Sequence, residues 1–226
     1  MIIIGHKDGG IEKASISRFT QKTKGYNTHT VIGGEFAVGP DMDGVAFKTL
    51  LGSCVAIMFY DNNKKVKGMN HFLLPSTNST NDDMKYGLYS VEAMLNEMYK
   101  LGCSKQNMVA KISGGADIMQ LTASLNSIGH RNVEFAKDFC KSEGFKLVSQ
   151  HTRGEHGRLI LLADEFQTFI KVTQKTETDK KILTEEKALQ TEITKAPVIK
   201  EYVGGVDLFG MESKEIVQPE MEIELF

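Results

Sequence analysis

The first long apolar run of the chain predicts a buried strand and the hairpin that follows it. Residues 55–60 (Val-Ala-Ile-Met-Phe-Tyr) are continuously apolar, which is typical of a strand covered on both faces. Residues 61–65 have turn composition, and residues 66–74 are predicted to form a second strand that Pro75 ends. Pairing of these two strands would bring the start of the first close to the end of the second.

Two later segments have apolar residues at the steps of three and four that predict amphipathic helices. The first helix is expected over residues 84–102 and is closed by Gly102. The second is expected over residues 132–143, with Asn132 as its N-cap and Gly144 at its end. Further strands are predicted over residues 108–112, 145–149, 158–163 and 167–172. This order indicates a mixed α/β (α+β) layered protein without regular βαβ alternation.

Composition narrows the function classes. Hydrophobic residues make up 41%, charged residues 25%, and the formal net charge is −2, which is not the footprint of a nucleic-acid-binding protein. No apolar run approaches the roughly 20 residues that a membrane-spanning helix needs. The apolar start of the chain breaks at Lys7, too early for a signal-peptide core, so a cytoplasmic protein without membrane insertion is expected.

The distribution of charge predicts three parts of the chain. Residues 174–226 carry 7 basic and 12 acidic residues, whereas residues 1–173 carry 20 basic and 17 acidic residues. We therefore expect a weakly ordered lead-in over residues 1–29, a globular body over residues 30–173, and an acidic C-terminal extension, disordered in part, over residues 174–226.

The extension mixes acidic and apolar residues, a pattern typical of an arm that docks on a partner or on its own body. Residues 181–193 predict one marginal helix, and Val206 to Phe209 form a hypothetical docking segment. A spacer without a specific partner is the alternative.

Three cysteines, Cys54, Cys103 and Cys140, form neither a disulfide framework nor a CxxC zinc motif. Cys103 and Cys140 fit the pattern of small buried hydrophobic residues. Cys54 begins a buried strand directly after Gly52 and Ser53, where glycine lets a substrate approach and free amides can stabilise an oxyanion. Taken alone, these residues leave Cys54 either a nucleophile or a core residue.

A thiol nucleophile needs a base that promotes the thiolate. Among the six histidines, His71 lies in the apolar strand that is predicted to pair with the strand of Cys54. We therefore predict a Cys54–His71 pair that needs neither a metal nor an organic cofactor. The Ser113 to Ala116 segment (Ser-Gly-Gly-Ala) lacks the lysine of a P-loop and is interpreted as a tight turn near the active site.

Several blocks of the chain resemble CheD, the family of chemoreceptor glutamine deamidases. The blocks span about residues 31–173 in order, and they are residues 34–38, 49–56, 68–71, 74–75, 85–87, 110–116, 128–133 and 157–158. The cysteine block and the Gly-Gly-Ala block together make this resemblance specific.

The resemblance implies a three-layer α/β/β fold, similar to the catalytic domains of deamidating toxins. It implies hydrolysis of selected glutamine side chains on methyl-accepting chemotaxis receptors to glutamate, and as a further activity the hydrolysis of glutamate methyl esters. Cys54 matches the nucleophile of the family and His71 its histidine, and Thr49 is the candidate for a third catalytic threonine. The phosphatase CheC is an implied partner.

Two functions therefore remain. The first is a glutamine deamidase that forms a thioester on Cys54. The second is an adaptor that binds CheC-type phosphatases or receptors, with catalysis secondary. The presence of both Cys54 and His71 favours the enzyme, and the extension, which has no family counterpart, favours an added binding role. A generic thiol protease is a weaker third interpretation, because no protease-type cysteine motif is present.

Overall fold

A computed structural model describes residues 1–41, 44–74, 81–118, 127–173 and 177–195 of the 226-residue chain. Its larger sheet, sheet A, has seven strands in the order β10-β9-β7-β8-β5-β1-β2. Neighbouring strands are antiparallel except β9 and β10, which are parallel. The strands of sheet A are β1 (Ile2–Gly5), β2 (Ile11–Ala14), β5 (Phe36–Pro40), β7 (Val55–Asp61), β8 (Val66–Asn70), β9 (Met108–Gly114) and β10 (Lys146–Thr152).

The smaller sheet, sheet B, has five strands in the order β12-β11-β6-β4-β3. Only the β4–β6 pair in it is parallel, among the described residues. The strands of sheet B are β3 (Lys22–Thr23), β4 (Tyr26–Thr30), β6 (Val45–Leu51), β11 (Arg158–Leu162) and β12 (Thr168–Val172). The helices are α1 (Asn81–Lys100), α2 (Ile128–Ser142) and α3 (Glu177–Lys195).

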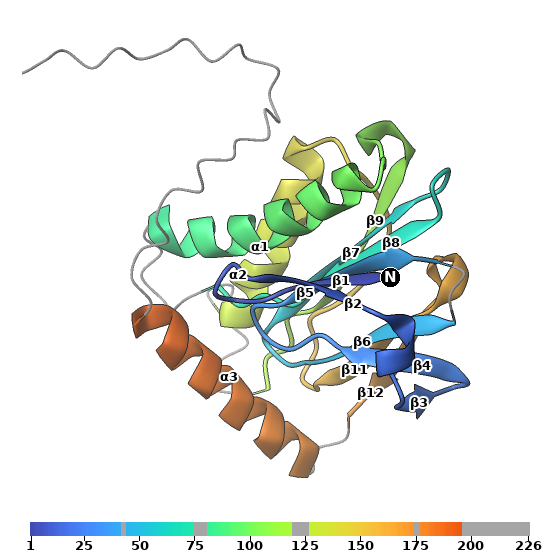
Figure 1. Cartoon of the computed structure of the whole chain (residues 1–226). Helices are drawn as coiled ribbons and strands as arrows, with labels where there is room; N and C mark the ends of the chain where they lie inside the picture. The colour runs from blue at the N-terminus through green and yellow to red at the C-terminus, as the bar shows by residue number, and fades with distance from the viewer. Residues whose placement is uncertain (42–43, 75–80, 119–126, 174–176, 196–226) are drawn as a thin grey trace, which may run out of the picture.

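The elements form three layers (Figure 1). Helices α1 and α2 cover one face of sheet A, where Val91 and Val133 pack with Ile57 of β7. The opposite face of sheet A packs on sheet B through a second core that includes Met58 and Phe47. Because side chains alternate along a strand, β7 supplies residues to both cores. This arrangement confirms the expected α/β class and the helix–sheet–sheet layering.

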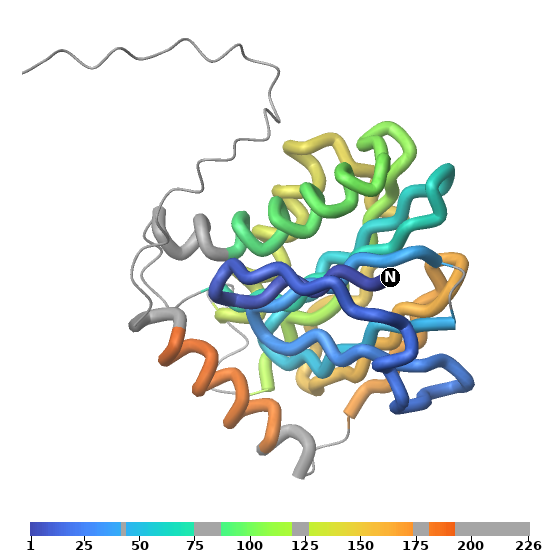
Figure 2. The backbone as a smooth tube through the Cα atoms, viewed as in Figure 1, coloured from blue at the N-terminus to red at the C-terminus, as the bar shows by residue number. Residues whose placement is uncertain are grey.

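The first 29 residues are part of the two sheets, so their interpretation as a weakly ordered lead-in is wrong. They form β1, β2, β3 and most of β4. Strand β1 is an inner strand of sheet A, and Ile2, Ile3 and Ile4 are buried. A four-residue apolar run is too short to show a period, and the partner of β1 on its inner side, β5, lies about 30 residues later in the chain. Figure 2 shows the N-terminal hairpin running alongside the other strands, with β2 at the edge of sheet A.

Helix α2 begins earlier than predicted. Its N-cap is Ser127, whose hydroxyl accepts a hydrogen bond from the His130 amide at 3.1 Å. Asn132, the predicted cap, lies inside the helix and is buried. Strand β8 ends at Asn70, four residues before the predicted end, and one bridge between Val55 and Phe72 extends the pairing beyond it.

The C-terminal extension contributes helix α3, which is longer than the predicted 181–193 helix. It crosses one edge of the molecule, away from α1 and α2 (Figure 1). The hypothetical docking segment at Val206 to Phe209 lies outside the described residues. Within the part of the chain that the structure describes, no helix has the length and apolar character that a membrane crossing requires.

Candidate active site

Cys54 and His71 lie at the open end of the β7–β8 hairpin and face the same side of sheet A. Val55 and Phe72 exchange two backbone hydrogen bonds of 3.0 and 2.9 Å, and their side chains face the helices. Each candidate residue directly precedes one of this pair, so both side chains face sheet B. The hairpin therefore places the cysteine and the histidine that the sequence pattern singled out at the same end of the sheet and on the same face.

Thr49 reaches His71 from the opposite sheet. It lies in β6, it is fully buried, and its Oγ1 is 2.8 Å from His71 Nδ1. The Thr49 hydroxyl donates its single hydrogen to the Val31 carbonyl at 2.7 Å. It must therefore accept from Nδ1–H of His71, which leaves Nε2 of the neutral ring as the proton acceptor.

His71 Nε2 is buried and has no hydrogen-bond partner among the described residues. Burial lowers the pKa of His71 to about 4, and a contact with the Val31 carbonyl partly opposes this shift. The imidazole is thus neutral at pH 7 and available as a base. Burial also raises the pKa of the Cys54 thiol well above its usual range, and the carboxylate of Glu186 adds to that rise. In the observed arrangement the thiol is therefore protonated.

The turn before Cys54 rests on the Gly-Gly-Ala segment, as the sequence suggested. The amide of Gly115 donates to the Cys54 carbonyl at 2.8 Å, and the amide of Ala116 donates to the Gly52 carbonyl at 2.7 Å. Gly114 has a φ of +120°, and a Cβ added there would lie 2.2 Å from the Cys54 carbonyl oxygen. Glycine is required at this position because no larger residue lets the two backbones approach so closely.

Asn132 holds both segments of the site, a role that the sequence reasoning missed. Its Nδ2 donates to the Ser53 carbonyl at 2.8 Å, and its Oδ1 accepts from the Leu74 amide at 2.8 Å. The side chain thus joins the cysteine turn to the segment that follows His71. An amide in the interior of an amphipathic helix, on its buried side, is the sequence signal that could have indicated this role.

Glu186 of α3 binds to the turn that the sequence predicted to supply oxyanion donors. The Ser53 hydroxyl donates to its Oε2 at 2.7 Å, and the Cys54 amide donates to its Oε1 at 3.0 Å. A Cβ added to Gly52 would lie 2.7 Å from Oε1, so glycine permits this approach. Gly52, Ser53 and Cys54 therefore form one oxygen-binding turn. Sequence reasoning missed Glu186 because an acidic residue in a polar helix is typical of a solvated face.

Comparison with known proteins gives consistent relatives. A family model described as CheD chemotactic sensory transduction matches residues 73–172, a segment that starts just after His71. A protein of Methanococcus vannielii named probable chemoreceptor glutamine deamidase CheD is 36% identical over 132 residues, which are 58% of this chain and 84% of the relative. Relatives with the same name from Rhizobium meliloti and Stenotrophomonas maltophilia are 41% and 34% identical, covering 57% and 74% of this chain and 70% and 82% of their own lengths. On identity and coverage together, the chain belongs to the CheD family.

Proposed function

We propose that the protein hydrolyses glutamine side chains of methyl-accepting chemotaxis receptors to glutamate, with Cys54 as the nucleophile. The names of its relatives support the receptor as substrate. The observation that carries the proposal is that the Cys54 amide and the Ser53 hydroxyl both donate to a glutamate side chain beside the cysteine. A turn that binds a glutamyl carboxylate has the donors that a glutamine amide under attack requires.

The first half of the reaction forms a thioester. His71 Nε2 takes the thiol proton, and the thiolate attacks the carbonyl carbon of the substrate amide. The negative oxygen of the tetrahedral intermediate accepts hydrogen bonds from the Cys54 amide and the Ser53 hydroxyl. His71 then returns the proton to the amide nitrogen, the carbon–nitrogen bond breaks, and ammonia leaves.

The second half releases glutamate. His71 takes a proton from water, the hydroxide attacks the thioester carbon, and the carbon–sulfur bond breaks as the thiol is re-formed. Thr49 holds the imidazole in one tautomer through both halves, because its only hydrogen is committed to the Val31 carbonyl. The same attack on a glutamate methyl ester releases methanol in place of ammonia.

The competing proposal is an adaptor that binds receptors or a CheC-type phosphatase, with catalysis secondary. A binding module has no need of a buried histidine that is oriented by a threonine and whose second nitrogen has no partner in the part of the chain that the structure describes. This arrangement supports the enzyme.

Site-resolved mass spectrometry of receptor cytoplasmic fragments, incubated with the full chain, separates the two proposals. The enzyme converts selected glutamines to glutamate over a prolonged incubation. Binding of the fragment without conversion at any site, both by the wild type and by a variant whose α3 is released from the cysteine turn, would leave the adaptor.

A further inference from the structure

Helix α3 closes the site that it touches. Cys54 is 1% exposed, and its amide is bound to the Glu186 carboxylate. A substrate amide needs the same donors, so it cannot bind while Glu186 holds them. The helix must therefore leave the turn before catalysis begins.

Two apolar side chains flank Glu186 on the same face of α3. Ile182 lies four residues before it and Leu189 three residues after it, and they are 2% and 8% exposed. Both side chains are buried against the body, whereas Lys187 and Ala188 are exposed to solvent. The helix thus presents one carboxylate between two apolar anchors.

Glycines of the body make room for these anchors. A Cβ added to Gly52 or Gly157 would lie 2.6 or 2.4 Å from a methyl of Ile182. A Cβ added to Gly33 would lie 2.4 Å from a methyl of Leu189. Three separate backbone segments therefore approach one helix closely through glycines.

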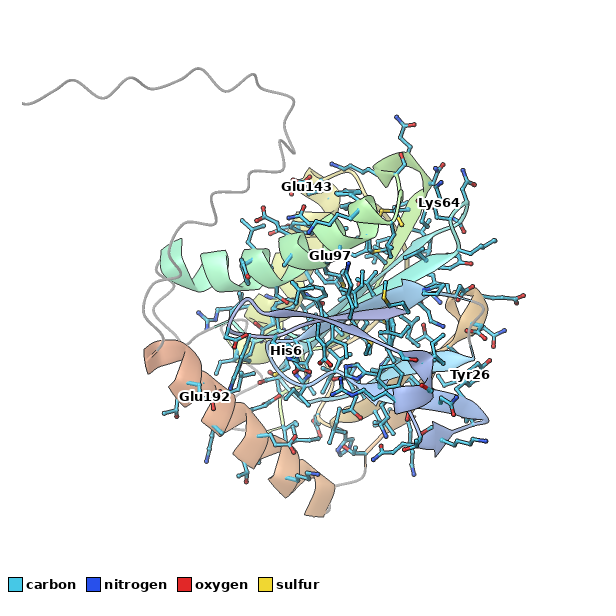
Figure 3. The ribbon with its side chains drawn as sticks, in the orientation of Figure 1. His6, Tyr26, Lys64, Glu97, Glu143 and Glu192 are labelled. Atoms are coloured by element: carbon cyan, nitrogen blue, oxygen red, sulfur yellow. The ribbon has the colours of Figure 1, made fainter. Side chains whose placement is uncertain are left out.

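An ion pair near the C-terminal end of α3 also joins the helix to the body. Glu192, labelled on α3 in Figure 3, forms an ion pair with Lys7 in the turn after β1. In Figure 2 this turn of the N-terminal hairpin reaches toward the end of α3. The charged pair is exposed, so it orients the helix and contributes little to its affinity.

We infer that α3 is a tethered product analogue, and that the surface beneath it docks a substrate helix carrying a glutamine with apolar residues four positions before and three positions after. A glutamate side chain has the shape of the glutamine it derives from, and it is the product of the proposed reaction, on which this inference rests. Residues 182, 186 and 189 of α3 reproduce the spacing that such a substrate presents. Tethering gives the helix a high effective concentration, so it competes with any substrate that arrives from solution.

The first test measures access to Cys54 in the full-length protein. Replacing both anchors in one variant (the anchor variant), Ile182→Asp with Leu189→Asp, places two charges at buried positions and should release α3. Alkylation of Cys54 by iodoacetamide, followed by peptide mapping, is expected to accelerate by about tenfold or more. The matched control, Lys187→Asp with Ala188→Asp, adds the same two side chains on the exposed face and leaves the rate unchanged.

Cys103 and Cys140 report on folding in the same experiment, because both are buried away from α3. Faster alkylation of Cys54 alone supports closure by α3. Equal Cys54 rates in the anchor variant, the control variant and the wild type overturn it. Faster alkylation of all three cysteines would mean that the anchor variant is unfolded. The milder variant Ile182→Ala with Leu189→Ala then takes its place, and faster alkylation of Cys54 alone or equal Cys54 rates again support or overturn closure.

The second test offers α3 itself as a substrate. A synthetic peptide of residues 177–195 with Glu186→Gln is incubated with the anchor variant, and conversion of its glutamine to glutamate is read by mass spectrometry. We expect conversion, and a reduction of about tenfold or more when Ile182 and Leu189 of the peptide are both alanine, since buried aliphatic anchors dominate such contacts. A receptor fragment that is converted while the peptide is not overturns the inferred substrate spacing.

The two tests separate this inference from the proposed function. If no variant converts either the receptor fragment or the peptide, the deamidase proposal fails, and the alkylation rates still decide whether α3 closes the site. If the wild type converts receptor fragments as fast as the anchor variant, the deamidase stands and the tethered analogue is wrong.

Discussion

Thr49 Oγ1 lies 2.8 Å from His71 Nδ1, and this contact joins the two sheets of the protein at the candidate active site. The threonine belongs to β6 of sheet B, and the histidine follows β8 of sheet A. Thr49 also donates to the Val31 carbonyl, so it orients the imidazole and fixes its tautomer.

Replacing Thr49 tests this orienting role. Thr49→Val keeps the shape and removes the hydroxyl, so we expect kcat to fall by roughly 10- to 100-fold with little change in KM. Thr49→Ser keeps the hydroxyl and should restore most of the activity. Equal activity in the valine and serine variants would show that the hydroxyl has no part in catalysis.

The stability of the fold should depend on pH through His71. Its pKa falls from 6.5 to about 4 on folding, so between these values the unfolded chain binds a proton that the folded protein does not. Stability is therefore complete above pH 6.5 and decreases as the pH falls toward 4. Going from pH 7 to pH 5 should cost roughly 2 kcal/mol from this group.

Urea unfolding at the two pH values checks this expectation, with His71→Gln as the comparison. The variant lacks the titrating ring, so its loss of stability between pH 7 and pH 5 should be smaller. An identical loss in both proteins would contradict the assigned pKa shift.

Both hydrogen bonds of the Asn132 side chain, the donated one and the accepted one, should contribute to the stability of the fold and to the position of the cysteine turn. Asn132→Asp retains an oxygen for the Leu74 amide and loses the donor to the Ser53 carbonyl, two contacts of 2.8 Å each in the wild type. Burying an unpaired carbonyl should cost about 1–3 kcal/mol of unfolding free energy and displace the cysteine turn. Chemical unfolding measures the loss of stability, and the deamidase rate measures the effect on the cysteine turn. Wild-type stability and rate in this variant would remove Asn132 from the site.

Gly114→Ala should damage the site more than an equivalent change elsewhere. Gly114 has a φ of +120°, and its added Cβ would lie 2.2 Å from the Cys54 carbonyl oxygen. Gly144 has a φ of +70°, with open space around an added Cβ, so Gly144→Ala carries only backbone strain of about 1 kcal/mol. Deamidase activity per folded molecule should be lost in the first variant and retained in the second. Equal activities would mean that the close approach at Gly114 has no bearing on Cys54.

Local patterns predicted those parts of the fold that depend on local forces. The continuous apolar run at residues 55–60 and the polar turn after it correctly predicted the β7–β8 hairpin. The steps of three and four predicted α1 and α2, although Ser127 rather than Asn132 caps α2. Strand β1 was missed because four apolar residues show no period, and pairing with β5 makes the strand.

In the candidate site, too, the sequence predicted what depends on local structure and missed what depends on distant parts of the chain. The placement of Cys54 and His71 at one end of the hairpin, on the same face, follows from a register that is local. The contact between Thr49 and His71 crosses two sheets, and the sequence suggested Thr49 only through a family resemblance. Glu186 is 132 residues from Cys54 in the chain, and its charge alone predicts a solvated residue. Its role depends on where α3 docks, which no periodicity encodes.

The identity of the nucleophile is tested most directly by comparing two single cysteine variants in the receptor-fragment assay. Cys54→Ala removes the proposed nucleophile, and Cys103→Ala removes a buried thiol whose pKa burial raises to about 12. We expect the wild type and Cys103→Ala to convert the same glutamines to glutamate at similar rates, and Cys54→Ala to convert none. Conversion by Cys54→Ala at the wild-type rate would contradict the account.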